Sequence, residues 1–216
     1  MSASTKVAII GAGNVGGGLG VNFSNKGIPV KFGIRPETDV KTLLAQCKDA
    51  SASAPSEAAA WGDVVFLAVP GSAAVEVARS LAGVLKGKVV VDCNNPLEWK
   101  DGPVWAPPPE GSLAAAIAKA VPGARVIKGF NTFGAEFHKE PGRAGVPADV
   151  YFAGDDTEAK KLVMEVATKA GFRPVDAGPL RNASVLENVA MLWIHLATVG
   201  GQGRDFTFNM RSREKA

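Results

Sequence analysis

Three glycines near the start of the chain have the spacing of a dinucleotide-binding turn. They form GxGxxG at positions 11, 13 and 16, directly after the apolar run KVAII and before a helical pattern. In such a turn the first glycine permits a tight bend, the second admits a pyrophosphate, and the third lets the helix pack on the strand. The helix N-terminus adds free N–H groups and a partial positive charge. We therefore expect the cofactor to contact Gly11, Gly13, Asn14, Val15 and Gly16.

The residues after the second expected strand, 29–34, predict which dinucleotide is bound. Proteins that bind NAD place an Asp or Glu there for the ribose hydroxyls. This chain has Ile34, Arg35 and Pro36 instead, with no carboxylate before Glu37. A guanidinium suits a 2′-phosphate, so we expect Ile34 and Arg35 to bind NADP(H) in preference to NAD. The alternative is an exposed arginine without a ligand.

Uncharged residues follow the other expected strands, where ligands of open α/β sheets bind. The candidate cofactor contacts there are Val69, Pro70, Asn94, Asn95 and Pro96, with Ala135 further along the chain. The family resemblance described below implies that Asn95, Asn131, Phe133 and, near the C-terminus, Trp193 position an acceptor. Amides and apolar groups suit a carboxamide and a flat ring, although each amide could equally satisfy a loop backbone.

The chain offers no evident proton donor or metal site. The single tyrosine, Tyr151, is followed four residues later by Asp155, so the Tyr-x-x-x-Lys device of short-chain reductases is absent. His138 and His195 lie outside metal-ligand spacing, and His195 falls on an apolar helix, where we expect a core residue. No side chain is therefore assigned an acid or base role.

The elements that must position these residues alternate between strand and helix. Expected strands cover 6–10, 29–34, 63–70, 88–93, 125–131, 149–154 and 172–178; expected helices cover 15–26, 39–47, 73–85, 113–120, 154–171 and 184–199. This alternation is typical of an α/β fold with a Rossmann-type, doubly wound, mostly parallel sheet and here a short C-terminal helical extension. Asp155 and Glu158 have capping-box spacing, residues 94–112 are expected to form a loop, and Phe206 and Phe208 alternate as in an edge strand.

The amino-acid composition and the charge distribution narrow the classes of binding partner that we expect. Among 216 residues, 24 Lys and Arg stand against 21 Asp and Glu without any block of like charge, so we expect no nucleic acid and no membrane surface as partner. Cys47 and Cys93 form no CxxC pair, no signal peptide is evident, and no apolar run reaches the roughly 20 residues of a membrane helix. We expect a soluble cytoplasmic protein whose apolar C-terminal helix could form a homodimer contact.

The chain resembles the family of NADP oxidoreductases dependent on the deazaflavin coenzyme F420. The resemblance lies in four segments, GAGNVG, DCNNPL, PGARVIKGFNT and DAGPLRNASVLENVAMLWIHLA. It implies an NADP-binding Rossmann domain over 1–178 and a C-terminal helix and tail, 179–216, that close an acceptor cleft near Pro179 to Asn182 and Trp193. A hydride then passes directly between stacked rings, which needs positioning more than an acid or base.

The chain departs from the resembled family at two places. Members carry a serine and two consecutive arginines where this chain has Ile34, Arg35 and Pro36, and a histidine near the acceptor where it has Asn131. The KGFN segment is instead similar to the cytosolic domain of membrane metalloreductases, which pass a hydride from NADPH to an ordinary flavin. The expected redox partner is thus a small molecule, either the deazaflavin or a flavin.

Two further functions fit the residues. A small imine or hydroxyacid reductase of the six-phosphogluconate-dehydrogenase type needs a large helical C-terminal domain, but only 38 residues follow Gly178. A non-catalytic NADPH sensor would also lack an acid or base. A change in nicotinamide absorbance on adding an acceptor would separate the enzyme from the sensor.

Overall fold

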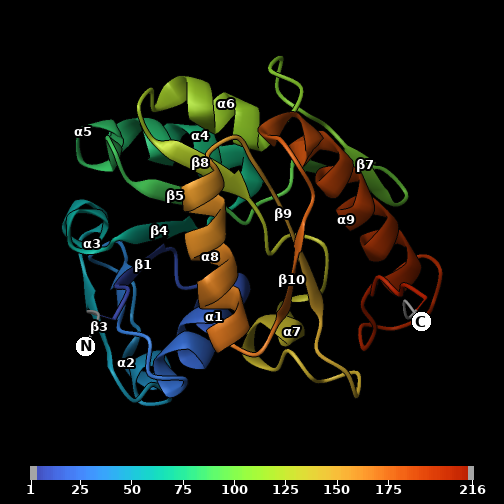
Figure 1. Ribbon diagram of the computed structural model, residues 1–216, viewed down its shortest axis with the longest axis horizontal. Helices are drawn as coiled ribbons and strands as arrows, with labels where there is room; N and C mark the ends of the chain where they lie inside the picture. Colours follow the sequence, from blue (N-terminus) through green and yellow to red (C-terminus); the bar gives the residue numbers. More distant parts are fainter. Residues whose placement is uncertain (1–3, 214–216) are drawn as a thin grey trace.

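An eight-stranded sheet forms the centre of the molecule in the computed structural model, which describes residues 4–213 (Figure 1). Its strands are β1 (Val7–Ile10), β2 (Val30–Gly33), β3 (Ala50–Ser53), β4 (Val64–Leu67), β5 (Val89–Asp92), β8 (Arg125–Lys128), β9 (Asp149–Gly154) and β10 (Arg173–Asp176). They lie in the order β10-β9-β8-β5-β4-β1-β2-β3, and every neighbouring pair is parallel except β8 with β9. The predicted α/β, doubly wound and mostly parallel fold is confirmed.

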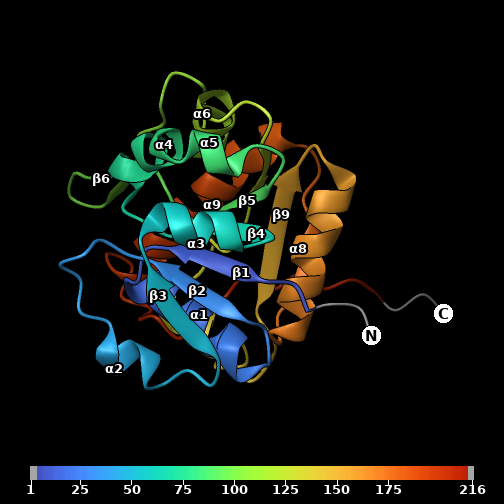
Figure 2. The same cartoon turned by 90° about the vertical axis from the view of Figure 1, so that its left-hand side faces the viewer.

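Helices cover both faces of this sheet, which explains its nearly continuous apolar strands. One face packs on α1 (Asn14–Asn25), α7 (Ala135–Lys139) and α8 (Thr157–Lys169); the other packs on α3 (Pro55–Trp61), α4 (Gly71–Ser80), α5 (Ala82–Leu85) and α6 (Leu113–Ala120). Along β1, Val7 and Ile9 face the first cluster while Ala8 and Ile10 face the second. In Figure 2, α3, α4 and α6 lie above the sheet and α1 lies below it.

Four regions of the chain differ from the expectations. The first region holds β3 and α3, which were both missed; ASAS at 50–53 has little β propensity. The expected helix 39–47 shortens to α2 (Lys41–Leu44), where the Asp39 carboxylate accepts the Lys41 N–H at 2.9 Å. The expected helix 73–85 divides into α4 and α5, and the expected loop 94–112 contains a hairpin of β6 (Leu97–Trp99) and β7 (Pro103–Trp105).

The cap of α8 also differs. The N-cap is Asp156, whose carboxylate accepts the Ala159 N–H at 2.8 Å, rather than Asp155. Asp155 accepts the N–H of Leu180 at 2.9 Å instead. It therefore ties the start of the 3-10 turn η1 (Leu180–Asn182) to the end of β9.

The C-terminal segment begins with η1 and continues as α9 (Ala183–Ala197), close to the expected helix. The expectation that His195 is a core residue was wrong: it is exposed, and the buried face of α9 carries Leu186, Ala190 and Trp193. The expected edge strand was also wrong. Through residue 213 the tail has no strand and is held by single contacts, such as the Tyr151 hydroxyl donating to the Phe208 carbonyl at 3.2 Å.

None of the helices between residues 4 and 213 combines the length and apolar character that crossing a bilayer requires.

Candidate functional site

A cavity of about 780 Å³ lies where β1, β2, β4 and β5 end. Ten of the thirteen predicted cofactor contacts line it: Gly11, Gly13, Asn14, Val15, Ile34, Arg35, Val69, Pro70, Asn94 and Asn95. The cavity also reaches residues that the sequence reasoning did not select, among them Thr38, Pro55, Ala73, Val77 and Cys93. Pro55 was missed because it follows β3, the strand that was itself missed.

The other three predicted contacts lie around this cavity. Gly16 lies beneath the turn in α1. Pro96 is buried, and its carbonyl accepts the N–H of Ala106 at 2.8 Å, which closes the base of the hairpin. Ala135 begins α7 and lines a second cavity of about 580 Å³ that shares Gly13 and Asn14 with the first.

The glycines of the turn serve two different purposes. Gly11 has φ +105°, and a Cβ there would lie 2.3 Å from the carbonyl oxygen of Ala68. A Cβ at Gly16 would lie 2.2 Å from the carbonyl oxygen of Gly11. Both positions therefore require glycine for the fold. A Cβ at Gly13 would meet no atom within 4 Å, so the space above Gly13 is open to a ligand at the N-terminus of α1.

Arg35 supplies the only charged side chain among the described residues that line the 780 Å³ cavity. The side chain is 80% exposed, and its Nε lies 3.2 Å from a carboxylate oxygen of Glu37. An exposed ion pair of this kind is weak, so the guanidinium can exchange it for a stronger anion. It lies beyond β2, at one end of the cavity.

Two asparagines meet at the opposite end of the cavity, beyond β5 and β8. Asn131 donates from Nδ2 to Asn95 Oδ1 at 2.9 Å, and Asn95 donates from Nδ2 to the Asn131 carbonyl at 3.0 Å. Asn131 Nδ2 also donates to the Leu186 carbonyl on α9 at 3.1 Å. Its Oδ1 is buried and has no hydrogen-bond partner among the described residues. A buried amide oxygen without a hydrogen-bond partner is uncommon in a folded protein.

The backbone before Asn131 is held in an unusual conformation. Phe130 has φ +58°, in the left-handed region, and its ring packs against Phe23, Phe66, Phe152 and Phe172. Its carbonyl oxygen lies 2.8 Å from Nε2 of the buried His138. Burial lowers the pKa of His138, which keeps the imidazole neutral. Core packing and this contact together fix the position of Asn131.

The remaining acceptor candidates are enclosed by protein. Phe133 is 7% exposed and stacks on Phe172 at 5.9 Å, as part of the core. Trp193 is 3% exposed, stacks on Phe206 at 5.3 Å and donates from Nε1 to the Phe206 carbonyl at 2.8 Å. The structure thus brings Asn95 and Asn131 together and joins Trp193 to the C-terminal tail.

Behind the asparagines lies a buried charged cluster that the sequence reasoning missed. Lys128, Asp92 and Glu187 are each 0% exposed, with Lys128 Nζ 2.8 Å from Asp92 Oδ2 and 3.0 Å from Glu187 Oε1. The signal in the sequence was a charged residue at the end of each of two apolar strands, VVVD and RVIK. We call these three residues the buried charged cluster.

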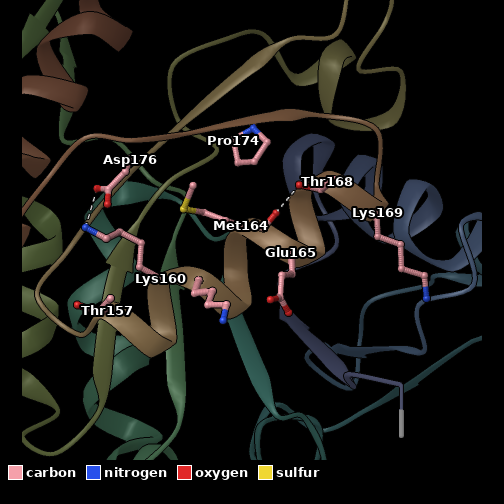
Figure 3. A pocket seen from close by; sticks show the side chains of 9 residues that line it. Thr157, Lys160, Met164, Glu165, Thr168, Lys169, Pro174 and Asp176 are labelled. Carbon is pink, nitrogen blue, oxygen red and sulfur yellow. Dashed lines mark hydrogen bonds and ion pairs between the residues drawn. The ribbon is translucent and has the colours of Figure 1, made fainter. Parts of the chain in front are cut away.

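A third cavity, of about 540 Å³, is lined only by residues of α8 and β10. Figure 3 shows Lys160 directed at Asp176, at a distance of 2.6 Å, and Thr168 bonded back to the Met164 carbonyl. These polar groups satisfy one another. The other polar side chains of the lining, Lys161 and Glu165 among them, are exposed, so this cavity is an open groove on the surface of α8.

The 780 Å³ cavity can bind and orient a ligand, but the described residues that line it include no proton donor of ordinary strength. Apart from Arg35, its polar side chains are those of Asn14, Thr38, Cys93, Asn94 and Asn95. Burial raises the pKa of the Cys93 thiol well above its usual range, so this thiol stays protonated. The chemistry that suits such walls is a transfer controlled by position.

Comparisons with known proteins agree with this geometry. A family model described as "NADP oxidoreductase coenzyme F420-dependent" matches residues 6–96. The F420-dependent NADP reductase of Methanothermobacter thermautotrophicus is 31% identical over 210 residues, which cover 88% of each chain. The metalloreductase STEAP3 of Rattus norvegicus is 31% identical over 186 residues, covering 86% of this chain but 36% of that protein. A crystal structure described as that of a "putative f420 dependent nadp-reductase" from Arthrobacter sp. FB24 is 27% identical and has a TM-score of 0.86. The match covers 97% of this chain and 100% of that chain.

Proposed function

The chain belongs to the family of NADP oxidoreductases dependent on coenzyme F420, and on that premise we propose that it transfers a hydride between NADP(H) and a deazaflavin or flavin ring. It is an NADP-dependent oxidoreductase with coenzyme F420 as co-substrate. The observation that carries this function is the dinucleotide turn, whose Gly13 faces open space in a cavity that the described residues line without a proton donor. Hydride transfer between two held rings needs orientation rather than an acid or base.

The residues of the 780 Å³ cavity fit NADP(H). The open space at Gly13 and the N-terminus of α1 suit the pyrophosphate, with Gly11, Asn14 and Val15 beside it and Gly16 holding the helix against the strand. Ile34 and Arg35 suit the adenosine and its 2′-phosphate. The nicotinamide would lie against the remaining wall, which is formed by Val69, Pro70, Asn94 and Asn95. Pro96 would support the loop behind this wall, and Ala135 borders the neighbouring cavity. When bound, this cofactor supplies or receives the hydride.

The acceptor ring would stack on the nicotinamide beside Asn95 and Asn131, with Phe133 and Trp193 behind. This placement is supported by the two hydrogen bonds that join Asn95, which lines the 780 Å³ cavity, to the side chain and the carbonyl of Asn131. In this proposal, residues 1–178 form the NADP-binding domain and 179–216 close the acceptor cleft. The Trp193 contact with the tail supports that division.

We also propose that the protein forms a homodimer in the cytoplasm. Val185, Leu192 and Val199 recur at seven-residue spacing along α9 and its end, and each is more than half exposed. Trp99, on the hairpin that packs against α9, is 57% exposed. A second copy would cover apolar side chains of this kind. The two free cysteines fit a reducing compartment.

The deciding experiment follows NADPH oxidation with coenzyme F420, flavin mononucleotide, flavin adenine dinucleotide and small imines as acceptors. We expect rapid oxidation with a ring acceptor. Deuteride from labelled NADPH should appear on the deazaflavin without solvent exchange, because the receiving atom is carbon. Preferential turnover of an imine would overturn the proposal in favour of an imine reductase. Tight NADPH binding with no turnover of any acceptor would favour a sensor.

A further inference from the structure

The buried charged cluster holds more negative than positive groups. Lys128 directs Nζ at three acceptors, namely Asp92 Oδ2 at 2.8 Å, Glu187 Oε1 at 3.0 Å and the carbonyl oxygen of Asn94. An ammonium group has three protons, so all of them are used. A single lysine therefore faces two carboxyl groups, and all three side chains are fully enclosed.

Every other partner of the two carboxyl groups is a hydrogen-bond donor. Asp92 Oδ1 accepts the backbone N–H and the side-chain amide of Asn94, at 3.0 and 2.8 Å. Glu187 Oε1 accepts the N–H of Leu113 at 2.9 Å, and its Oε2 accepts the indole N–H of Trp105 at 3.0 Å. A proton on either carboxyl group would face a donor instead of an acceptor. Both are therefore carboxylates, and the cluster carries a formal net charge of −1.

This charge lies directly behind one end of the cofactor cavity. Asn94 lines that cavity, and both its carbonyl and its side chain contact the cluster. Arg35 lies at the other end, beyond β2, and β1 and β4 separate β2 from β5 in the sheet. At about 4.8 Å between strands, the two ends are about 14 Å apart. The cavity thus has a cation at one end and a buried anionic cluster behind the other.

We propose that the buried charged cluster favours the oxidised nicotinamide at this end of the cavity and so biases the bound cofactor toward giving up its hydride. Hydride transfer moves one proton and two electrons to the acceptor ring. The nicotinamide ring gains a unit positive charge, and a proton from solvent neutralises the reduced acceptor. A net negative charge behind Asn94 stabilises the ring that becomes positive. This inference rests on the proposed function, because it needs the nicotinamide beside Asn94.

The expected effect is measurable as a ratio of two affinities. We take a separation of about 10 to 15 Å between the cluster and a ring placed beside Asn94, and an effective dielectric constant of about 20. Coulomb's law then gives about a 5- to 20-fold change in the relative affinity of NADP⁺ and NADPH. Any loss of shape at the site weakens both cofactors together. Their ratio isolates the electrostatic effect, since the two forms differ by the charge of the ring.

The test compares dissociation constants for NADP⁺ and NADPH, by calorimetry, in the wild type and three variants. Glu187→Gln removes one negative charge from α9, and Asp92→Asn removes one from β5. Glu165→Gln makes the same change on the exposed face of α8 and serves as the matched control. We expect the dissociation constant of NADP⁺ relative to NADPH to rise 5- to 20-fold in the first two variants and to stay constant in the control.

The outcomes separate this inference from the proposed function. If Glu187→Gln and Asp92→Asn bind both cofactors with the wild-type ratio, the electrostatic role is refuted while the site remains. If wild-type protein binds neither NADP⁺ nor NADPH, the proposed function and this inference fail together. Thermal melts of the two cluster variants identify folded samples, and a shifted ratio in either folded variant supports the inference.

Discussion

Replacement of Arg35 by alanine should weaken NADPH binding and leave NADH binding almost unchanged. Arg35 is the single charged side chain among the described residues lining the cofactor cavity, so a 2′-phosphate has no other cation there. The backbone of Arg35 is held independently of the guanidinium, because its carbonyl accepts the N–H of Thr38 at 3.0 Å. The alanine variant should therefore keep the local chain path.

The magnitude follows from the contact that Arg35 makes without ligand. A hydrogen bond to a charged group contributes about 1.5 to 3 kcal/mol. Binding the phosphate gives up the ion pair with Glu37, whose side chains are 80% and 65% exposed. Such a pair contributes about 0.2 to 1 kcal/mol. The net loss in Arg35→Ala should be about 0.5 to 2.8 kcal/mol, which is about a 2- to 110-fold weaker NADPH complex.

The assay is a titration of NADPH and NADH at one fixed salt concentration, because exposed charges are screened by ions. Glu37→Gln provides the matched comparison, since it frees Arg35 without removing it. We expect this variant to bind NADPH up to about fivefold more tightly. Equal losses for NADPH and NADH in Arg35→Ala, or an unchanged NADPH affinity, would refute the assignment of Arg35 to the 2′-phosphate.

Three further predictions concern the glycine turn, Asn131 and His138. Gly13→Val should abolish dinucleotide binding with little change in melting temperature. Gly16→Val should instead lower the melting temperature, because its Cβ would lie 2.2 Å from the Gly11 carbonyl oxygen. Unchanged dinucleotide affinity in Gly13→Val would make the turn purely structural. Asn131→Ala should reduce the rate of hydride transfer far more than NADPH affinity, and Asn131→His should favour deazaflavin over flavin, as single-turnover kinetics with both acceptors would measure. Burial holds the pKa of His138 below its ordinary 6.5, so the unfolded state takes up a proton at a higher pH than the folded state does. The free energy of unfolding should therefore fall as the pH drops below 6.5, by up to about 1.4 kcal/mol per pH unit. Urea unfolding on both sides of pH 6.5 should show this loss in the wild type and less of it in His138→Gln, and identical pH dependences would contradict the assignment.

Much of the fold was predictable because its main signals are local. Apolar runs such as VAII and VVFL mark strands buried on both faces, and the glycine turn lies within one βα unit. The same locality explains why Arg35 could be selected from the sequence. The strand at 50–53 was not predictable, since its ASAS sequence is ordered mainly by pairing with β2.

The polar network of the site was not predictable, because its members are far apart in the chain. Lys128 and Asp92 are separated by 36 positions, and Trp105 and Glu187 by 82. No pattern of spacing reports such contacts. The left-handed backbone at Phe130 likewise depends on tertiary packing. The sequence had predicted a strand through residue 131, but β8 ends at Lys128, two residues before this conformation.

The contact between Lys128 and Glu187 also has a consequence for the order in which the chain folds during synthesis. Glu187 lies 59 positions after Lys128 and therefore leaves the ribosome about 3 to 12 s later. In that interval Lys128 can pair with Asp92, but the cluster lacks α9, and the N–H of Leu113 and the indole of Trp105 lack their acceptor. Water must fill that side of the sheet until α9 docks. Docking of α9 is then a late event that seals several polar groups at once. We expect nascent chains that end before residue 187 to hold the glycine turn in place while the far end of the cavity stays wet and unformed.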